Sequence, residues 1–297
     1  MIDQAQKLRE SFASAPLRAR DAAPTPPAAA GACTRTCRSV AITSGKGGVG
    51  KTNICLSLAI TLAMMKKKVL VLDADLGLAN IHILLGISPG RTLEQYVRNE
   101  CGLHDTIIKG PAGVHILPGA SGIESMADLE PLKLGILTRE LSTLEQAYDF
   151  LLIDTGAGIG RVAAGFASMA DMAILVVTPE PTSFADAYAM VKILYKKRNT
   201  PVSVLVNMAA SDKDGAETFD RLNALVVRFL RRPLVRLCII PFDKQVSTAV
   251  RRQAAMVVMC PHAPFASQIR HACGVLCGAP LAATRKENFF SRLLKVR

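Results

Sequence analysis

A glycine-rich stretch with two lysines, SGKGGVGKTN at residues 44–53, is the part of the sequence best suited to chemistry. Its spacing fits the phosphate-binding pattern GxxxxGK[ST], which places backbone N–H groups and a helix N-terminus around a phosphate. In that pattern Lys51 bridges the β- and γ-phosphates and the Thr52 hydroxyl ligates Mg²⁺. We therefore expect an ATP site with contacts from Gly45, Lys46, Gly47, Gly48, Val49, Gly50, Lys51, Thr52 and Asn53.

Carboxylates follow two apolar runs further along the chain. VLVL at 69–72 leads into Asp73 and Asp75, and the run in DFLLIDTGAGIG at 149–160 ends in Asp154. A continuous apolar run is typical of a buried parallel strand, and open α/β sheets bind ligands at the carboxyl ends of their strands. Because a phosphate loop precedes it, we interpret Asp154 as the Walker B acid that holds Mg²⁺.

The apolar pattern indicates the elements that must position these groups. Strand-like runs lie near residues 40, 70, 115, 151, 174, 204 and 238. They alternate with segments of helical spacing at 52–65, 131–147, 183–197, 216–230 and 264–277. This alternation predicts an α/β fold, a single doubly wound and mostly parallel sheet with helices on both faces.

The two ends of the chain differ from the middle. Residues 1–12 form a short element, and 13–38 read as a flexible Ala/Pro/Arg-rich linker before an ATPase domain at 39–280 and a terminal helix at 281–297. The net charge of +12 is concentrated at the ends: residues 1–38 hold six Lys/Arg and three Asp/Glu, and residues 285–297 hold five and one. Basic ends suit either an anionic surface or simple solubility.

Targeting signals and a metal cluster are not indicated. No secretory segment or long apolar run is seen, so we expect a cytosolic protein whose eight cysteines stay as thiols. The pairs Cys33/Cys37 and Cys273/Cys277 have CxxxC spacing, which fits ordinary helix or core cysteines better than a zinc site.

Lys46, the first lysine of the loop, narrows the choice among families of P-loop proteins. KGGVGKT resembles the deviant Walker A sequence of the MinD/ParA group of ATPases. The resemblance implies that Lys46 reaches the ATP of a partner subunit and stabilises the transferred phosphoryl group, so that ATP joins a homodimer. DADLGLAN at 73–80 resembles the switch I sequence of the same group, which implies that Asp75 positions the attacking water and Asp73 supports the Mg²⁺ shell. His82 is a departure, since close relatives usually have Asp there.

The resemblance also implies residues for the base and ribose. It places Asn207 at the edge of the adenine and Glu180 near the ribose or the dimer face. The loop beside the base is expected to contain Pro241, Phe242 and Asp243.

Within the group, the sequence resembles those of the flagellar-number regulators of the FlhG (FleN/YlxH) type. DADLGLANIHILLGI and TPEPTSFADAYAMVK carry this resemblance, together with an N-terminal DQAxxLR motif. In that family the motif docks on the GTPase FlhF and stimulates GTP hydrolysis, which implies partner contacts from Asp3, Gln4, Ala5, Leu8 and Arg9. Flagellar switch (C-ring) components or a flagellar transcription regulator are further implied partners, with no direct specific nucleic acid.

The C-terminal sequence KENFFSRLLKVR has the pattern of an amphipathic helix. Its large apolar residues share one face and its basic residues lie off that face, which is typical of an interfacial helix on an anionic membrane. We expect membrane contacts from Phe289, Phe290, Arg292, Leu293, Leu294 and Lys295, with a tail packed on the domain as the alternative. The location expected is cytoplasmic and reversibly peripheral on the inner face of the cell membrane, at the pole.

Other functions of the same fold remain as alternatives. A ParA-type partition ATPase or a MinD-type division-site ATPase would share the nucleotide site. An iron–sulfur carrier would need a CxxC-type cluster site, and CGVLC at 273–277 has one residue too many. A non-catalytic binding module would have lost Lys46, Lys51, Asp75 or Asp154, and all four are present.

Overall fold

The computed structural model describes residues 37–75, 81–87, 90–118, 131–279 and 287–294. Compactness divides the chain into Met1–Thr34 and Arg35–Arg297, and every described residue belongs to the second unit. The expected activator motif and all but the last two residues of the expected linker lie outside the described residues. Within the described ranges, no helix combines the length and the apolar character needed to cross a bilayer.

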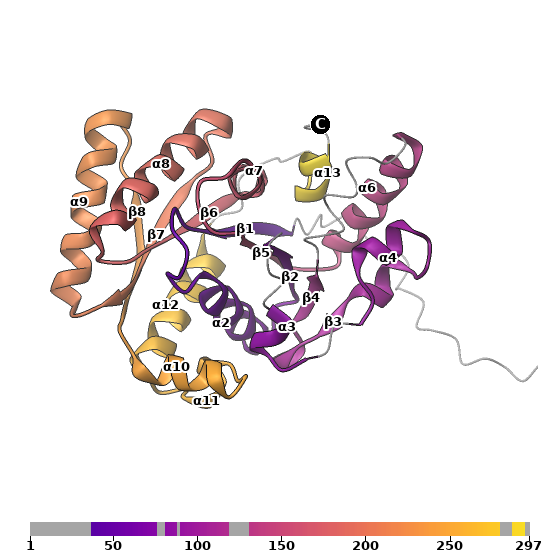
Figure 1. Ribbon diagram of the computed structural model, residues 1–297, viewed down its shortest axis with the longest axis horizontal. Coiled ribbons are helices and arrows are strands. Elements are labelled where there is room, and N and C mark those ends of the chain that lie inside the picture. Colours follow the sequence, from indigo (N-terminus) through magenta and orange to yellow (C-terminus); the bar gives the residue numbers. More distant parts are fainter. Residues whose placement is uncertain (1–36, 76–80, 88–89, 119–130, 280–286, 295–297) are drawn as a thin grey trace, which may run out of the picture. The chain divides into compact units, whose positions relative to one another are not determined.

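Eight strands form one sheet in the order β3-β4-β2-β5-β1-β6-β7-β8 (Figure 1). All neighbouring pairs are parallel except β3 and β4. The predicted, mostly parallel sheet is thus confirmed. The short β3 was not predicted, because two residues carry no periodic signal. The strands are β1 (Arg38–Thr43), β2 (Val69–Ala74), β3 (Ile108–Lys109), β4 (His115–Pro118), β5 (Phe150–Thr155), β6 (Met172–Val177), β7 (Val202–Ala209) and β8 (Val235–Pro241).

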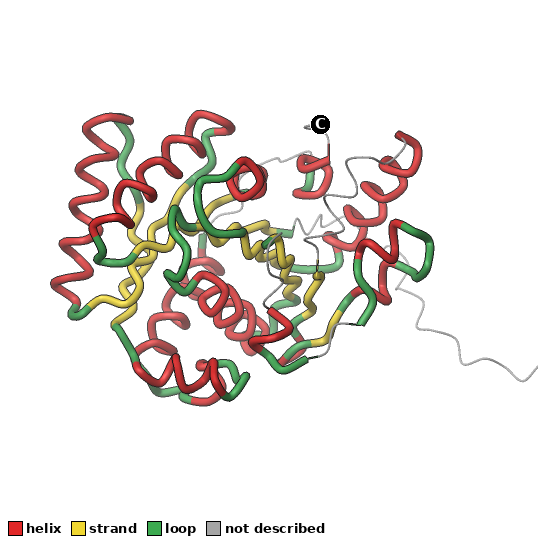
Figure 2. The backbone as a smooth tube through the Cα atoms, in the orientation of Figure 1, coloured by secondary structure: helices red, strands yellow, loops and turns green. Residues whose placement is uncertain are grey.

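Helices cover both faces of the sheet (Figures 1 and 2). One layer contains α2 (Lys51–Met64), α10 (Lys244–Arg251), α11 (Met256–Met259) and α12 (Pro264–Gly278). The other contains α6 (Pro131–Gln146), α7 (Arg161–Met169), α8 (Pro181–Arg198), α9 (Asp212–Leu230) and α13 (Phe289–Leu294). The sheet edge near β3 and β4 adds α3 (Ile81–Leu84), α4 (Leu93–Val97) and the 3₁₀ turns η1 (Leu103–Thr106) and η2 (Pro111–Gly113).

The five predicted helices are present with shifted ends. The largest shift is at α9, which begins four residues before the predicted start because the Ser211 hydroxyl accepts a hydrogen bond from the Asp214 N–H at 3.1 Å. Its polar first turn has no apolar periodicity, so the pattern alone could not include it.

The core consists of two apolar clusters, one on each face of the sheet. Along β1, Val40 and Ile42 belong to the cluster under α2 and α12, and Ala41 belongs to the cluster under α6 to α8. All six β1 residues are buried, as are those of β2 and β5. Burial on both faces explains why these strands read as continuous apolar runs.

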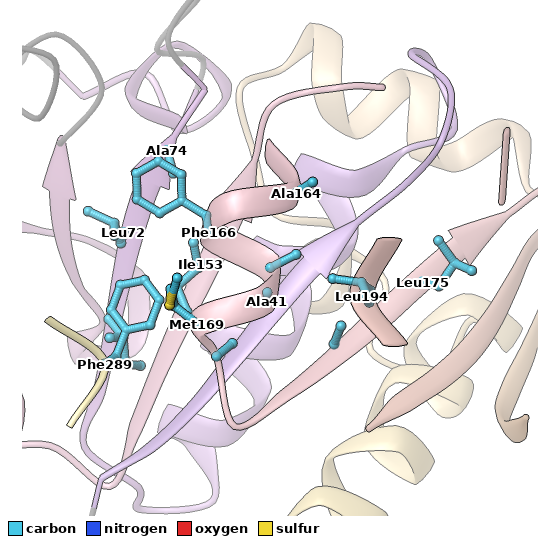
Figure 3. Packing of buried hydrophobic residues seen from close by; sticks show 14 of the residues in the cluster. Ala41, Leu72, Ala74, Ile153, Ala164, Phe166, Met169, Leu175, Leu194 and Phe289 are labelled. Atoms are coloured by element: carbon cyan, nitrogen blue, oxygen red, sulfur yellow. The ribbon is translucent and has the colours of Figure 1, made fainter. Parts of the chain in front are cut away.

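The C-terminal helix α13 is part of this core. Phe289 and Phe290 are fully buried, and Phe289 stacks on Phe166 of α7 with ring centroids 6.4 Å apart (Figure 3). Leu294 is buried and Leu293 packs against the same cluster. The apolar face that we expected to meet lipid is therefore covered in this structure, because an amphipathic pattern fits a helix on a protein core as well as one on a membrane.

Polar contacts fix α13 at both ends. The Glu145 carboxylate accepts hydrogen bonds from the N–H groups of Phe289 at 3.0 Å and Phe290 at 3.2 Å. Arg292, expected beside headgroups, is instead buried in an ion pair with Asp171 at 2.9 Å and donates to the Ser39 hydroxyl at 3.1 Å. Burial raises the pKa of Glu145 to about 7, against the opposing effect of its hydrogen bonds and of Arg292. Lys295 lies outside the described residues.

Candidate nucleotide site

Two glycines of the phosphate loop are required by close contacts. Gly50, the residue before α2, has φ of 88°, and a Cβ atom there would lie 2.7 Å from Nδ2 of Asn207. A Cβ atom on Gly45 would lie 2.2 Å from the backbone carbon of Asp186 in α8. The loop therefore fits between β7 and α8 only with glycine at these positions.

Lys51 begins α2 and points toward the carboxylates at the strand ends. It is buried, and burial lowers its pKa, while the charges of Asp154 and Asp75 raise it. A buried cation beside the helix N-terminus concentrates positive potential where the phosphate pattern requires it.

Asp73 and Asp154 are neighbours at the ends of β2 and β5. They are paired in register, and both are almost fully buried. Burial raises the pKa of Asp73 to about 6 and that of Asp154 to about 7; a hydrogen bond from Thr52 opposes the latter shift. In the described part of the chain, Oδ1 of Asp154 has no hydrogen-bond partner. A buried carboxylate oxygen left without a partner fits a divalent cation, so the predicted set of Thr52, Asp73 and Asp154 suits Mg²⁺.

Asp75 lies between the first acid and the loop after β5. Its N–H donates to Oδ1 of Asp73 at 3.3 Å. Its carboxylate lies against Gly156, where an added Cβ would be 3.4 Å from Oδ1. The structure thus brings Asp73, Asp75 and Asp154 together at the carboxyl ends of adjacent strands, near Lys51.

Lys46 turns away from the buried carboxylates. Its Nζ lies 2.5 Å from Oε2 of Glu180 and 3.2 Å from the Thr182 hydroxyl, both at the start of α8. The side chains of Lys46 and Glu180 are 40% and 59% exposed, so this contact is at the surface. Glu180, expected near the ribose or the dimer face, here holds the loop lysine. The sequence analysis did not predict the contact with Thr182, because no sequence pattern links Lys46 to a hydroxyl group 136 positions away.

The expected base-binding residues come from β7 and the loop after β8. The Asn207 amide donates to the Val49 carbonyl at 2.9 Å, which ties the end of β7 to the phosphate loop. Phe242, which follows Pro241 at the end of β8, donates its N–H to the Ala209 carbonyl at 2.9 Å, and the residue is 58% exposed. Asp243 caps α10 by accepting a hydrogen bond from the Gln245 N–H. Phe242 is therefore an exposed aromatic residue in the loop where the base was expected.

Comparisons with known proteins agree with this geometry. A family model described as an AAA domain matches residues 37–204. The chain is 40% identical over 260 residues to the antiactivator FleN of Pseudomonas aeruginosa, which covers 86% of this chain and 93% of that protein. It is 33% identical over 264 residues to the flagellum site-determining protein YlxH of Helicobacter pylori, at 86% and 89% coverage. The solved structure of the septum site-determining protein MinD of Pyrococcus horikoshii with Mg-ADP superposes with a TM-score of 0.63 at 27% identity, covering 81% of this chain and 96% of that one.

Proposed function

The chain belongs to the FlhG/MinD type of P-loop ATPases, and from this premise we propose that it is an ATP-dependent dimerising switch that regulates the number and placement of flagella. The observation that supports the proposal is the grouping of Lys51 with Asp73, Asp75 and Asp154 at the carboxyl ends of the strands, with a second loop lysine, Lys46, at the surface. The similarity to FleN and YlxH supports the flagellar assignment.

Each residue of the site is proposed to have a separate role in the reaction. Lys51 and the loop N–H groups would bind the phosphates, and Asn207 and Phe242 would fix the base. Thr52, Asp73 and Asp154 would hold Mg²⁺, which when bound neutralises charge on the phosphate oxygens. Asp75 would orient a water molecule toward the γ-phosphate, since its carboxylate borders the loop after β5.

Lys46 would connect ATP binding to dimerisation. In this structure it is paired with Glu180 and Thr182 at the surface, and a surface ion pair is worth only about 0–1 kcal/mol. The γ-phosphate of ATP in a partner subunit would compete readily for this lysine. Charge stabilisation in trans then makes hydrolysis depend on the dimer.

The loop that follows Asp154 could carry a change at the nucleotide to α13 through α7. The loop after Asp154 leads directly into α7, and Phe166 of α7 stacks on Phe289 of α13. Burial of each Phe side chain stabilises the packed position of α13 by about 1.5–3 kcal/mol. The helix therefore stays packed unless its contacts in another state contribute a similar free energy. A shift of α7 on ATP-dependent dimerisation would weaken this contact and release α13 to the membrane.

The test is vesicle sedimentation at about 0.5 M salt, where purely electrostatic attachment is screened. We expect the full chain to dimerise on size-exclusion chromatography and to pellet with anionic vesicles in ATP but not in ADP. Arg292→Ala, which removes the ion pair that holds α13, should pellet in both nucleotides. Adding Leu293→Glu should abolish pelleting and leave dimerisation intact.

The matched control is Arg98→Ala, which breaks an exposed i,i+4 pair with Glu94 on α4. It should behave as wild type. Equal pelleting of the wild type in ATP and ADP, or an Arg292→Ala protein that never pellets, would exclude a nucleotide-gated α13.

The N-terminal DQAxxLR segment is proposed to stimulate an FlhF-type GTPase, with C-ring components or a flagellar transcription regulator as further partners at the polar membrane. A peptide of residues 1–12 should raise the GTP turnover of that GTPase by at least about 10-fold, which is well below the roughly 10³–10⁵-fold supplied by a residue that completes a GTPase site. The control peptide carries Leu8→Ala and Arg9→Ala. An inactive wild-type peptide with a GTPase that hydrolyses GTP would contradict the assignment.

A further inference from the structure

A basic surface lies at the edge of the sheet opposite the nucleotide site, where the strands have their amino ends. The C-terminal halves of α8 and α9 pack side by side (Figure 1), and the Arg232 guanidinium hydrogen-bonds Asn199 across them. These helix ends lead into the amino ends of β7 and β8, whereas the phosphate loop and the acids lie at the carboxyl ends. We call this the α8–α9 surface; its exposed cations are Lys196, Lys197, Arg198, Arg228, Arg231 and Arg236.

The charge of this surface is unbalanced. Residues 187–211 contain four Lys/Arg and residues 221–242 contain five, with no Asp or Glu in either segment. Residues 39–284 carry only +5 in total, so the rest of that range is 5 − 9 = −4. Among the described residues, none of the six exposed cations has an ion pair with a carboxylate. These two segments thus account for the net positive charge of residues 39–284.

Apolar side chains project among these cations. Phe229 is 57% and Val235 62% exposed. Phe229 packs edge-on against Tyr188 with centroids 6.1 Å apart, and the Arg228 guanidinium lies 5.3 Å from the centre of its ring. This combination of cations with exposed aromatic and aliphatic groups is typical of a surface that meets a lipid headgroup layer.

We infer that the α8–α9 surface binds anionic lipid headgroups and forms a second membrane contact, independent of α13 and of the ATP switch proposed above. A headgroup layer accepts the cations at its phosphates and the apolar side chains just below them, whereas duplex DNA offers its backbone charge but no apolar layer for Phe229 and Val235. Since the apolar face of α13 is covered in the structure, the α8–α9 surface would supply a lipid contact while α13 stays packed.

The test uses the full chain without nucleotide at about 0.1 M salt, with vesicles of phosphatidylcholine containing 30% phosphatidylglycerol. We expect pelleting that is absent with phosphatidylcholine alone. Each cation strengthens partitioning on the order of fivefold, so Lys197→Glu with Arg228→Glu should weaken it by more than about 25-fold. Lys133→Glu with Arg139→Glu on α6 makes the same change in net charge and should weaken it less than about threefold, by the screened long-range effect. Phe229→Ser should weaken binding without changing how steeply binding falls with salt, because it removes an apolar contact and no charge.

Three outcomes would overturn the inference. One is equal loss of pelleting in the α8–α9 and α6 double variants, which would reduce the effect to net charge. Another is wild-type protein that does not pellet with the anionic vesicles. The third is release of vesicle-bound protein by a 40-base-pair random duplex at equal phosphate concentration, with the α8–α9 variant losing duplex binding; the surface would then be a nucleic-acid site. Circular dichroism of each variant controls for folding.

Discussion

Asp75→Ala should bind ATP with near-normal affinity and hydrolyse it at least 100-fold more slowly than the wild type. A positioned acid–base residue contributes about 10²–10⁴-fold to a rate. Asp75 contacts the loop after β5. The residues expected to bind Mg²⁺ and the phosphates are Asp154, whose Oδ1 has no partner among the described residues, and Lys51, so ATP binding should not depend on Asp75. The measurements are single-turnover hydrolysis, equilibrium binding of a fluorescent ATP analogue, and size-exclusion chromatography, where the ATP dimer should accumulate.

Asp75→Asn separates the two roles that the carboxylate could have. The amide keeps the size of the side chain and one oxygen, so a residue that only supports Gly156 should tolerate it. If Asp75 acts on the water, the Asp75→Asn variant should hydrolyse ATP nearly as slowly as the Asp75→Ala variant. Loss of ATP binding in either variant would contradict this role and would place Asp75 among the residues that hold the metal or the loop.

The sequence predicts the sheet and the phosphate loop well because their determinants are local. The phosphate pattern lies within ten consecutive residues, so it is recognised from one stretch of sequence, although the structure requires two of its glycines, Gly45 and Gly50, because of contacts with Asp186 of α8 and Asn207 of β7. The acids Asp73 and Asp154 follow buried runs, and parallel pairing then brings them together without further information. Topology therefore converts two local patterns into one site.

The contacts of Lys46 and α13 could not be predicted in the same way. Glu180 lies 134 positions from Lys46, and Glu145 lies 144 positions from Phe289, so no local pattern links them. The periodicity of residues 289–294 shows which face of the helix is apolar, but not that α6 and α7 are the helices that cover this face. Arg292 shows the same limit, because its ion-pair partner Asp171 lies far from it in the sequence.

Lys46→Ala should lower ATP turnover by about 1,000-fold or more while leaving ATP affinity within about 10-fold, because a cation supplied in trans acts on the transition state. Lys51→Ala should lose binding as well as turnover, since Lys51 lies buried in its own site. Glu180→Gln is the matched control. It frees Lys46 from an exposed ion pair and should change turnover less than about fivefold. These rates are measured at saturating ATP and several protein concentrations.

Mixing two inactive variants tests whether Lys46 acts across the dimer. Lys46→Ala protein retains Asp75, and Asp75→Ala protein retains Lys46. In a mixed dimer, the first subunit has its own Asp75 and receives Lys46 from the second, so one complete site forms. With random pairing, half of the dimers are mixed and one of their two sites is active, so turnover should recover to about a quarter of the wild-type rate. If Lys46 serves its own subunit, no pairing completes a site and the mixture stays as inactive as its components.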